Sequence, residues 1–497
     1  MTYTVTDLFC GAGGSGLGAS AVPGVELTMA ANHWELAIET HQTNFPGTDH
    51  DCADISQVEP RRYRRTSILW ASPECTNHSN AKARKRLAQQ TLFDGEPDSS
   101  AVRSRATMWD VPRFAEHHRY EAIVVENVVE AAQWEMFPAW LMAMDLLGYD
   151  RHIVWLNSMH AAAIGSPRAP QSRDRMYVVF WRKGNRVPDL DLRPAAWCGP
   201  CDKEVKAVQV FKPRTKRWPL ARWGKYRTQY VYRCPTPRCH ADVEPYVVPA
   251  SAVIDWSDPG GRIGDRTDPL EPATMARITA GLARYAVPQL VPAGGTWNTD
   301  TTPVTAPFRA RTTRETEGLL VPLEARDGKW ARTAEMPMRT QSTRAETALV
   351  VPYYGTGRAR PATEVMPTMT TVDTAGLAFI AELRGGGSLV RPVSEPLAAV
   401  CAGGNHHMLV RNDHNGVLRT PPFTGHPEPS TGSGAAPRVE DCTFRMLSTA
   451  EIGEAMGFRR DYVICGTSKR NKVRQLGNGV TPPAAELLIR AVVDSLS

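Results

Sequence analysis

The sequence of 497 residues contains no uninterrupted apolar stretch long enough to cross a bilayer. Its first residues, MTYTVTDLFCGAGGSG, lack a basic segment followed by an apolar one, so no secretory signal is indicated. The glycine-rich turn at residues 7–18 has neither the GxGxxG spacing of dinucleotide enzymes nor a P-loop lysine. These absences predict a cytoplasmic protein with no membrane partner, in which the ten cysteines are thiols or metal ligands rather than disulfides.

The net charge is only +6, but the basic residues are unevenly distributed. Residues 183–239 contain fourteen Lys or Arg against four Asp or Glu, and a second basic run, KARKR, occupies residues 82–86. Such clusters favour a polyanionic partner such as DNA or RNA. A solvated surface is the alternative interpretation of the same charge.

Residues 1–182 show apolar strand patterns alternating with helical ones, which predicts an α/β fold with a doubly wound, mostly parallel sheet of Rossmann-like type. Ligands of such sheets bind at the carboxyl ends of the strands. Residues 183–440 are instead rich in Pro and Gly and form an inserted β-rich lobe in this interpretation. Residues 441–497 return to helix and are expected to complete the first domain.

The inserted lobe contains a loose repeat at about residues 300–410. Its units begin at prolines about thirty residues apart and end in an apolar, strand-like stretch. The stretch HPEPSTGSGAAP at 426–437 is expected to be a connection. After it, Ser448 and Glu451 have the spacing of a capping box and predict the start of a helix.

Two cysteine pairs separated by thirty-two residues, within about residues 195–245, predict a metal site. In a cytoplasmic protein the pattern Cys-x2-Cys … Cys-x4-Cys indicates a zinc ribbon with a structural Zn²⁺. The expected ligands are Cys198, Cys201, Cys234 and Cys239. Two alternatives remain open from the spacing: two disulfides, or His240 in place of Cys239. The basic and aromatic residues between the pairs suit DNA contacts, or equally a small core around the metal.

Five short motifs occur in a fixed order: DLFCGAGG (7–14), SPECTNHS (72–79), VVENV (124–128), QSRDR (171–175) and QLGNGV (475–480). Together they resemble the DNA (cytosine-5) methyltransferase family over about residues 1–182 and 442–497. The resemblance implies S-adenosyl-L-methionine as the methyl donor and double-stranded DNA as the partner. Residues 183–440 then stand where that family has its variable target-recognition region.

The resemblance assigns Cys75 as the nucleophile, and the chemistry supports such a residue. Carbon 5 of cytosine becomes reactive when a thiolate adds to carbon 6. A carboxylic acid near ring N3, Glu126, would stabilise charge on the ring, and Arg175, with Arg173 beside it, would hold O2 and that glutamate. The base has to be flipped out of the duplex. The alternatives are a buried structural thiol for Cys75, a helix cap for Glu126 and surface charges for the arginines.

The resemblance also implies the cofactor-binding residues. They lie in the first turn, after the second strand, in the ADI sequence at 53–55 and in the last motif: Phe9, Gly11, Gly13, Gly14, His33, Trp34, Asp54, Ile55, Asn478 and Val480. His33 stands where the family has an acid that binds the ribose hydroxyls, so Glu35 could substitute, and a plain loop role for His33 remains open. Trp34 is expected to stack on adenine.

A second departure is Glu74, which precedes Cys75 where the family usually has proline. Its charge would raise the pKa of the thiol unless the side chain points away or pairs with Lys82 or Arg84, and we expect one of these. The predicted function is DNA (cytosine-5) methylation in restriction–modification or phage self-protection, by a monomer. The alternative is a pyrimidine C5-modifying enzyme with another donor or substrate, and a catalytically inactive DNA-binding protein is the third possibility.

Overall fold

The computed structural model describes residues 2–73, 106–213, 223–258, 260–270 and 439–497, together with short segments between residues 272 and 412. Glu74 and Cys75 lie outside the described residues, as do Lys82 and Arg84. The expected connection at 426–437 and most of the repeat region also lie outside them.

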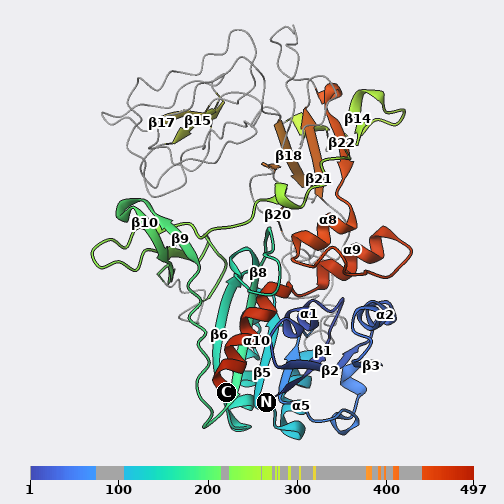
Figure 1. Cartoon of the computed structure of the whole chain (residues 1–497), viewed down its shortest axis with the longest axis vertical. Coiled ribbons are helices and arrows are strands. Elements are labelled where there is room, and N and C mark those ends of the chain that lie inside the picture. Colours follow the sequence, from blue (N-terminus) through green and yellow to red (C-terminus); the bar gives the residue numbers. More distant parts are fainter. Residues whose placement is uncertain are drawn as a thin grey trace, which may run out of the picture.

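The centre of the described chain is a seven-stranded sheet of order β3-β2-β1-β4-β5-β8-β6 (Figure 1). Only β8 runs antiparallel to its neighbours β5 and β6, so the sheet is mixed. The order reverses beside β1, because the chain moves outward through β2 and β3 and then returns to β4 on the other side. The bounds are β1 (Tyr3–Leu8), β2 (Val25–Asn32), β3 (Asp49–Cys52), β4 (Ile68–Ala71), β5 (Ala122–Asn127), β6 (Tyr149–Asn157) and β8 (Asp174–Arg182).

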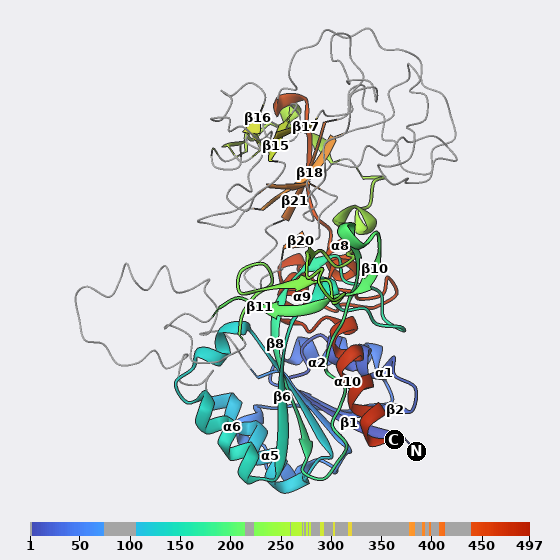
Figure 2. The same cartoon turned by 90° about the vertical axis from the view of Figure 1, so that its left-hand side faces the viewer.

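Helices cover both faces of this sheet (Figure 2). One face carries α1 (Gly14–Ser20), α2 (Glu35–Asn44) and α10 (Pro482–Leu496), and the other carries α5 (Asp110–His118) and α6 (Phe137–Leu146). All six residues of β5 are buried as a result. This double coverage explains why the sequence AIVVEN is an almost continuous apolar run rather than an alternating one.

The C-terminal helix α10 packs against α1 at very close range. A Cβ atom on Gly14 would overlap the Val480 carbonyl, and one on Gly18 would overlap the Pro482 carbonyl. The first and last segments of the chain therefore pack against each other. Glycines of the first turn are required here for packing, in addition to any role toward a ligand.

The cysteine-bearing segment forms two small sheets next to β6 and β8. One pairs β9 (Ala195–Cys198) with β10 (Lys203–Lys206), and the other joins β11 (Val208–Phe211), β12 (Tyr230–Arg233) and β13 (Asp242–Val243). We call residues 195–246 the four-cysteine ribbon. Its buried residues belong to the same hydrophobic cluster as one face of the central sheet.

A separate outer lobe lies beyond the central domain (Figure 1). Its larger sheet has the order β14-β22-β21-β18-β19 and its smaller one β16-β15-β17. The last strand of the lobe, β22 (Thr443–Met446), lies beyond residue 440, and the chain then enters α8 (Thr449–Ala455) and α9 (Lys469–Asn478). The other bounds are β14 (Gly261–Arg262), β15 (Gln289–Pro292), β16 (Thr302–Pro303), β17 (Glu317–Leu320), β18 (Leu377–Glu382), β19 (Val390–Pro392) and β21 (His407–Asn412). A short strand of the lobe, β20 (Leu397–Ala398), pairs with β7 (Gln171–Ser172).

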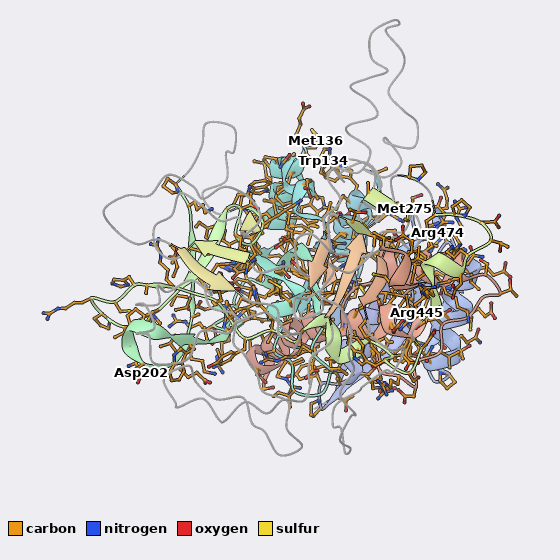
Figure 3. All side chains as sticks on the ribbon, turned by 90° about the horizontal axis from the view of Figure 1, so that it is seen from above. Trp134, Met136, Asp202, Met275, Arg445 and Arg474 are labelled. Carbon is orange, nitrogen blue, oxygen red and sulfur yellow. The ribbon has the colours of Figure 1, made fainter. Side chains whose placement is uncertain are left out.

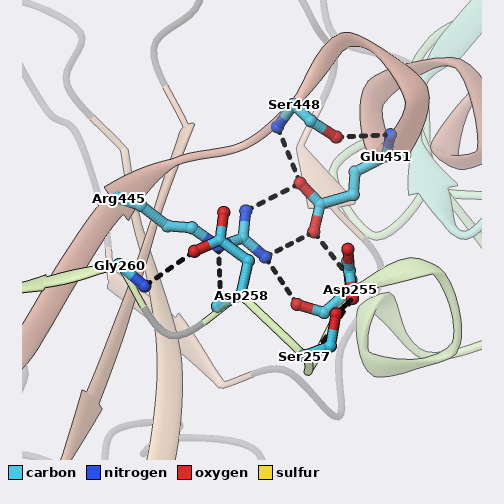
Figure 4. A network of polar contacts seen from close by, with 7 residues as sticks. All are labelled: Asp255, Ser257, Asp258, Gly260, Arg445, Ser448 and Glu451. Atoms are coloured by element: carbon cyan, nitrogen blue, oxygen red, sulfur yellow. Dashed lines mark hydrogen bonds and ion pairs between the residues drawn. The ribbon is translucent and has the colours of Figure 1, made fainter.

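A buried ion pair, Arg445–Glu451, lies where the outer lobe joins the central domain (Figure 4). Arg445 of β22 donates to both oxygens of Glu451, at 2.7 and 2.8 Å, and also to the Asp255 and Asp258 carbonyls. Glu451 accepts from the backbone N–H of Ser448, whose hydroxyl accepts from the Glu451 N–H. The predicted capping box is thereby confirmed. Through Arg445 and Glu451, the segment that leads into the outer lobe at residues 255–258 is joined to the segment that leaves it at residues 445–451.

Candidate active site and four-cysteine cluster

The motifs separated in sequence meet at one edge of the central sheet. Strands β1, β2, β3, β4 and β5 are parallel, so their carboxyl ends share that edge, and β8 begins there because it runs the other way. The glycine turn, the residues after β2 and β3, and the ENV and QSRDR motifs are therefore neighbours in space. The strand order reverses beside β1, and ligands of open α/β sheets bind at such a reversal, outside the carboxyl ends of the strands.

Glu126 and Arg175 form an ion pair across β5 and β8. The Arg175 Nε lies 2.8 Å from a Glu126 carboxylate oxygen, and the two side chains are 15 % and 10 % exposed. The antiparallel register sets Glu126 opposite Tyr177, which brings the start of β8 beside the end of β5. A largely desolvated carboxylate held by a guanidinium can present a polar, directional group to a flat ring.

The first two residues of the SPECTNHS motif, Ser72 and Pro73, are described, and hydrogen bonds to β1 and β5 hold their backbone. The Ser72 N–H donates to the Leu8 carbonyl at 3.1 Å, and the Asn127 side-chain amide donates to the Pro73 carbonyl at 3.3 Å. Asn127 is buried and also accepts from the Val128 N–H. The ENV asparagine thus joins β5 to the segment that continues to Cys75.

The Arg173 side chain contacts different residues from the Arg175 side chain. Arg173 is 2 % exposed and donates to the carbonyls of Gly477 and Gly479, at 3.0 and 2.9 Å. Its backbone N–H donates to the Asn157 side chain. These contacts lock the QSRDR segment to the last motif, so the structure places Arg173 as a buried tie between motifs.

The first turn adopts left-handed backbone angles at several positions. Phe9 has φ 59° and Gly11 has φ 54°, and a Cβ on Gly11 would meet nothing closer than the Phe9 carbonyl at 4.0 Å. Gly13 also has a positive φ, and a Cβ there would overlap the Tyr462 hydroxyl. The space in front of Gly11 is open, whereas Gly13 and Gly14 are enclosed by the C-terminal segment.

The buried carboxyl group of Asp7, at the end of β1, is hydrogen-bonded to the start of α1 beside this turn. The Ser15 hydroxyl donates to one Asp7 oxygen at 2.5 Å. Burial raises the Asp7 pKa from its ordinary value to about 7, against the opposing effect of the hydrogen bonds from Ser15 and the Gly16 N–H. The proton on Asp7 therefore contributes to folding below pH about 4, and this contribution is lost as the pH rises through about 7.

The residues predicted for the nucleoside part of the cofactor lie around Trp34. The Arg474 guanidinium of α9 stacks on the Trp34 ring at 4.6 Å from its centroid, while His33 is exposed beside it. Asp54 is exposed and accepts from the Ser56 N–H and hydroxyl, which caps a short 3-10 helix, Ile55–Gln57.

The remaining predicted positions differ in exposure. Ile55 is only 1 % exposed and packs in the core, and Val480 is 5 % exposed. Asn478 is exposed at the end of α9. Glu35, the possible substitute for an acid at position 33, is exposed in the first turn of α2.

The four predicted metal ligands converge on one point. The Sγ atoms of Cys198, Cys201, Cys234 and Cys239 all lie within 4.8 Å of one another, and the Cys198–Cys239 and Cys201–Cys234 distances are 3.6 and 3.8 Å. Tetrahedral Zn–S bonds of about 2.3 Å would separate the sulfurs by about 3.8 Å. The cysteines are free thiols rather than disulfides, and His240 is not part of the cluster.

The cluster and the cofactor edge are distinct places on the molecule. Asp202, which follows Cys201, and Arg474 lie on opposite sides in Figure 3. A metal at the cluster would therefore not touch the Trp34 region. The donor set of four thiols and its closed geometry fit a structural rather than a catalytic ion.

Sequence reasoning missed several residues that shape the site. Arg474 sits in a polar helix with no apolar periodicity, and its stacking partner is more than four hundred positions away. Asn127 was part of a recognised motif, but its tie to Pro73 needs the register of β4 and β5. In neither case did the local sequence contain a signal for the contact.

A search of the described residues for membrane spans finds no helix with the length and apolarity needed to cross a bilayer. It concerns helical spans in the described part of the chain only.

The first part of the chain is similar in sequence to known proteins. The family model described as C-5 cytosine-specific DNA methylase matches residues 3–216. The Type II methyltransferase M.HgiDI of Herpetosiphon aurantiacus is 26 % identical over 188 residues, 37 % of this chain and 53 % of the relative. M.SsoII of Shigella sonnei is 24 % identical over 183 residues, 36 % of this chain and 43 % of the relative. The chain thus spans about half the length of the curated relatives it matches.

Solved structures show a more distant likeness. The S. pombe Dnmt2 methyltransferase aligns with a TM-score of 0.46 at 11 % identity, covering all of both chains. The Entamoeba histolytica methyltransferase EhMeth aligns with a TM-score of 0.43 at 11 % identity, covering 100 % of this chain and 99 % of the other.

Proposed function

We propose that the chain transfers a methyl group from S-adenosyl-L-methionine to carbon 5 of cytosine in double-stranded DNA, because residues 3–216 match the model of the C-5 cytosine-specific DNA methylase family. The observation that carries this proposal is the Glu126–Arg175 ion pair at the carboxyl edge of the sheet. The chain continues from β4 to Cys75 at this same edge.

Named residues perform the addition and methyl-transfer steps of the proposed reaction. The Cys75 thiolate adds to carbon 6 of a flipped cytosine, so that electron density at carbon 5 can attack the methyl donor. Glu126 stabilises charge at ring N3, and Arg175 orients Glu126 and the O2 atom. Loss of the proton from carbon 5 and departure of the thiolate restore the ring. Cys75 follows Pro73 by two residues, so covalent geometry keeps their Cα atoms within about 8 Å.

The residues at the carboxyl edge of the sheet fit a nucleoside cofactor. The backbone is left-handed at Phe9 and open in front of Gly11, and Trp34 offers an aromatic ring. When bound, S-adenosyl-L-methionine supplies an electrophilic methyl group. The chain's own residues would hold it: the turn would approach it closely, Trp34 and Asp54 would contact the adenine, and the exposed Asn478 would close the site. Ile55 and Val480 support this site from the core.

We propose that the four-cysteine cluster binds one Zn²⁺, on the strength of its sulfur separations. Residues 1–182 and 441–497 form the catalytic domain in this proposal, and the lobe within 183–440 selects the DNA sequence. Restriction–modification or phage self-protection in the cytoplasm is the biological setting, because the relatives are named Type II methyltransferases. A monomer suffices, since each DNA strand can be modified separately.

A second candidate function follows from the absence of an acid at position 33. His33, with the Arg474 guanidinium nearby, makes this part of the edge less negative than a carboxylate would. A donor with a different group on sulfur, or another pyrimidine substrate, would be the consequence. Identification of the modified base by mass spectrometry separates this reading from the first.

Glu126→Gln is expected to lower kcat by roughly 10²- to 10⁴-fold, because the amide cannot carry the charge or proton that ring N3 requires. Initial rates with labelled S-adenosyl-L-methionine and duplex DNA provide the measurement. Glu121→Gln is the matched control, because Glu121 lies before the opposite end of β5 and pairs with Arg65 and Arg182. An unchanged kcat in the Glu126 variant would remove this residue from the reaction.

Arg474→Ala is expected to weaken binding of S-adenosylhomocysteine by roughly two- to fivefold, because the Trp34 ring loses its stacked cation. Calorimetric titration of the free protein measures this without DNA. Arg470→Ala, an exposed arginine on the same helix, should leave the Kd unchanged. Equal affinities for all three proteins would show that the stacking does not order the adenine site.

A further inference from the structure

Four aromatic residues between the cysteine pairs face the central domain rather than solvent, whereas Trp197 and Tyr246 of the ribbon are 51 % and 41 % exposed. Trp223, Tyr226, Tyr230 and Tyr232 are at most 9 % exposed. The Trp223 ring meets Trp155 of β6 edge-on at a centroid distance of 6.5 Å, and Tyr226 and Tyr232 pack edge-on against His160. Rings buried in this way have no free face for a nucleotide base. Of the two roles open from the sequence, these four rings fill the role of a core.

Polar contacts from the ribbon reach the residues that follow Glu126. The Trp223 Nε1 donates to the Val129 carbonyl at 3.3 Å, and the Lys225 Nζ lies 2.6 Å from a Glu130 carboxylate oxygen. Val129 and Glu130 begin the short 3-10 helix Val129–Gln133. This helix leaves β5 directly after the ENV motif. The ribbon therefore holds the exit of the strand that carries Glu126.

A further contact reaches the residue before Arg175. The Tyr226 N–H donates to a side-chain oxygen of Asp174 at 3.0 Å, where Asp174 begins β8. The Gln209 amide also donates to the Trp155 carbonyl at 2.8 Å on the neighbouring strand β6. The same four-residue stretch, Trp223 to Tyr226, thus touches the supports of both members of the Glu126–Arg175 pair.

The cysteine pairs stand on either side of this stretch. Cys201 and Cys234 enclose thirty-two residues, and Trp223 to Tyr226 lie among them. A metal that joins the two pairs closes this loop and limits the freedom of the stretch inside it. The Cys198 and Cys234 side chains belong to the same buried cluster as Val129 and Trp155, so the constraint passes into the core of the central domain.

We propose that the four-cysteine ribbon is a brace for the catalytic pair, with Lys225 and Tyr226 as positioning residues that act through Glu130 and Asp174. The metal holds the ribbon, the ribbon holds the ends of β5 and β8, and these ends set the Glu126–Arg175 geometry. A displacement of about 1 Å in such a pair can cost roughly 10²-fold in rate. This inference rests on the proposed methyl transfer and goes beyond a DNA-reading role for the ribbon.

The test is Lys225→Met, which keeps most of the apolar stem but removes the contact with Glu130. We expect kcat to fall by roughly 10- to 100-fold, with the Kd for duplex DNA, measured by fluorescence anisotropy, changed by less than about twofold. The partner variant Glu130→Gln should give a similar loss. The double variant should lose little more than either single one. Arg233→Met, which breaks only the exposed pair with Asp242, is the matched control.

Three results would overturn the proposal. If Lys225→Met bound DNA more weakly but kept its kcat, Lys225 would be a DNA contact. If its kcat and its Kd for DNA were both unchanged, the ribbon would have no influence on the Glu126–Arg175 pair. Additive losses in the double variant would show that the two residues act separately. If Lys225→Met does not fold, Glu130→Gln alone decides the question. A wild-type protein that transfers no methyl group would instead contradict the proposed function itself.

Discussion

Cys75→Ser is expected to abolish methyl transfer, with kcat lower by roughly 10⁴-fold or more. A hydroxyl is far less nucleophilic than a thiolate at neutral pH, so carbon 6 of the base would not be attacked. The measurement is incorporation of labelled methyl groups into duplex DNA at saturating donor and DNA concentrations. DNA binding should persist, because the substitution leaves the lobe and the ribbon untouched.

The same variant has a chemical readout that does not depend on turnover. Wild-type protein should form a denaturation-resistant complex with DNA that contains 5-fluorocytosine, because fluorine at carbon 5 prevents release of the thiolate. Cys75→Ser should form none, and Cys52→Ser, at an exposed cysteine at the end of β3, should trap as the wild type does. Trapping by the Cys75 variant would remove this residue from its proposed role.

Removal of the metal is expected to have the second large effect. Structural zinc sites of this type contribute about 10–16 kcal/mol of binding free energy, which exceeds the net stability of many domains. Cys234→Ser should therefore lower the metal content from one Zn²⁺ per chain to well below half. It should also lower kcat by roughly 100-fold or more, because the ribbon shares a core with the central domain.

Elemental analysis of the purified protein and thermal unfolding provide the two measurements. Cys52→Ser again serves as the control, because Cys52 is not one of the four clustered thiols. Wild-type protein without bound metal would contradict the zinc assignment. A Cys234 variant that lost the metal but kept its kcat would contradict the brace while leaving the zinc site intact.

Much of the central domain was predictable because its apolar runs are strong. The alternating strand and helix patterns predicted over residues 1–182 correspond to β1, β2, β4, β5, β6 and β8 with helices between them, and the helix predicted within residues 441–497 corresponds to α10. The edge strand β3 was missed, since its sequence DHDC has no apolar pattern and it is held by backbone pairing to β2. The polar helix α9 was missed for a similar reason.

The candidate site shows where the sequence ceases to be informative. The resemblance to the methyltransferase family implied that Arg175 holds Glu126, and the two side chains are in contact. The antiparallel direction of β8, which makes the 2.8 Å contact possible, depends on the path of the whole chain. The contacts of Lys225 and Tyr226 with the central domain are long-range pairings between polar groups. No local periodicity encodes such pairings.

The ribbon illustrates how one pattern can support two readings. Cysteine spacing predicted a common metal site, and the four sulfurs converge within 4.8 Å. The basic and aromatic residues between the pairs suited either DNA contacts or a core, and burial of Trp223 and its tyrosine neighbours favours the core. Side-chain type alone could not decide this, because exposure is a property of the packed molecule.

The central claim is methyl transfer to carbon 5 of cytosine, and identification of the product tests it most directly. Purified protein would be incubated with mixed-sequence duplex DNA and labelled S-adenosyl-L-methionine, and the DNA would be digested to nucleosides for mass spectrometry. The account predicts label in 5-methylcytosine alone, and none with Cys75→Ser. Label in another nucleoside, or none at all from protein that binds both donor and DNA, would contradict it.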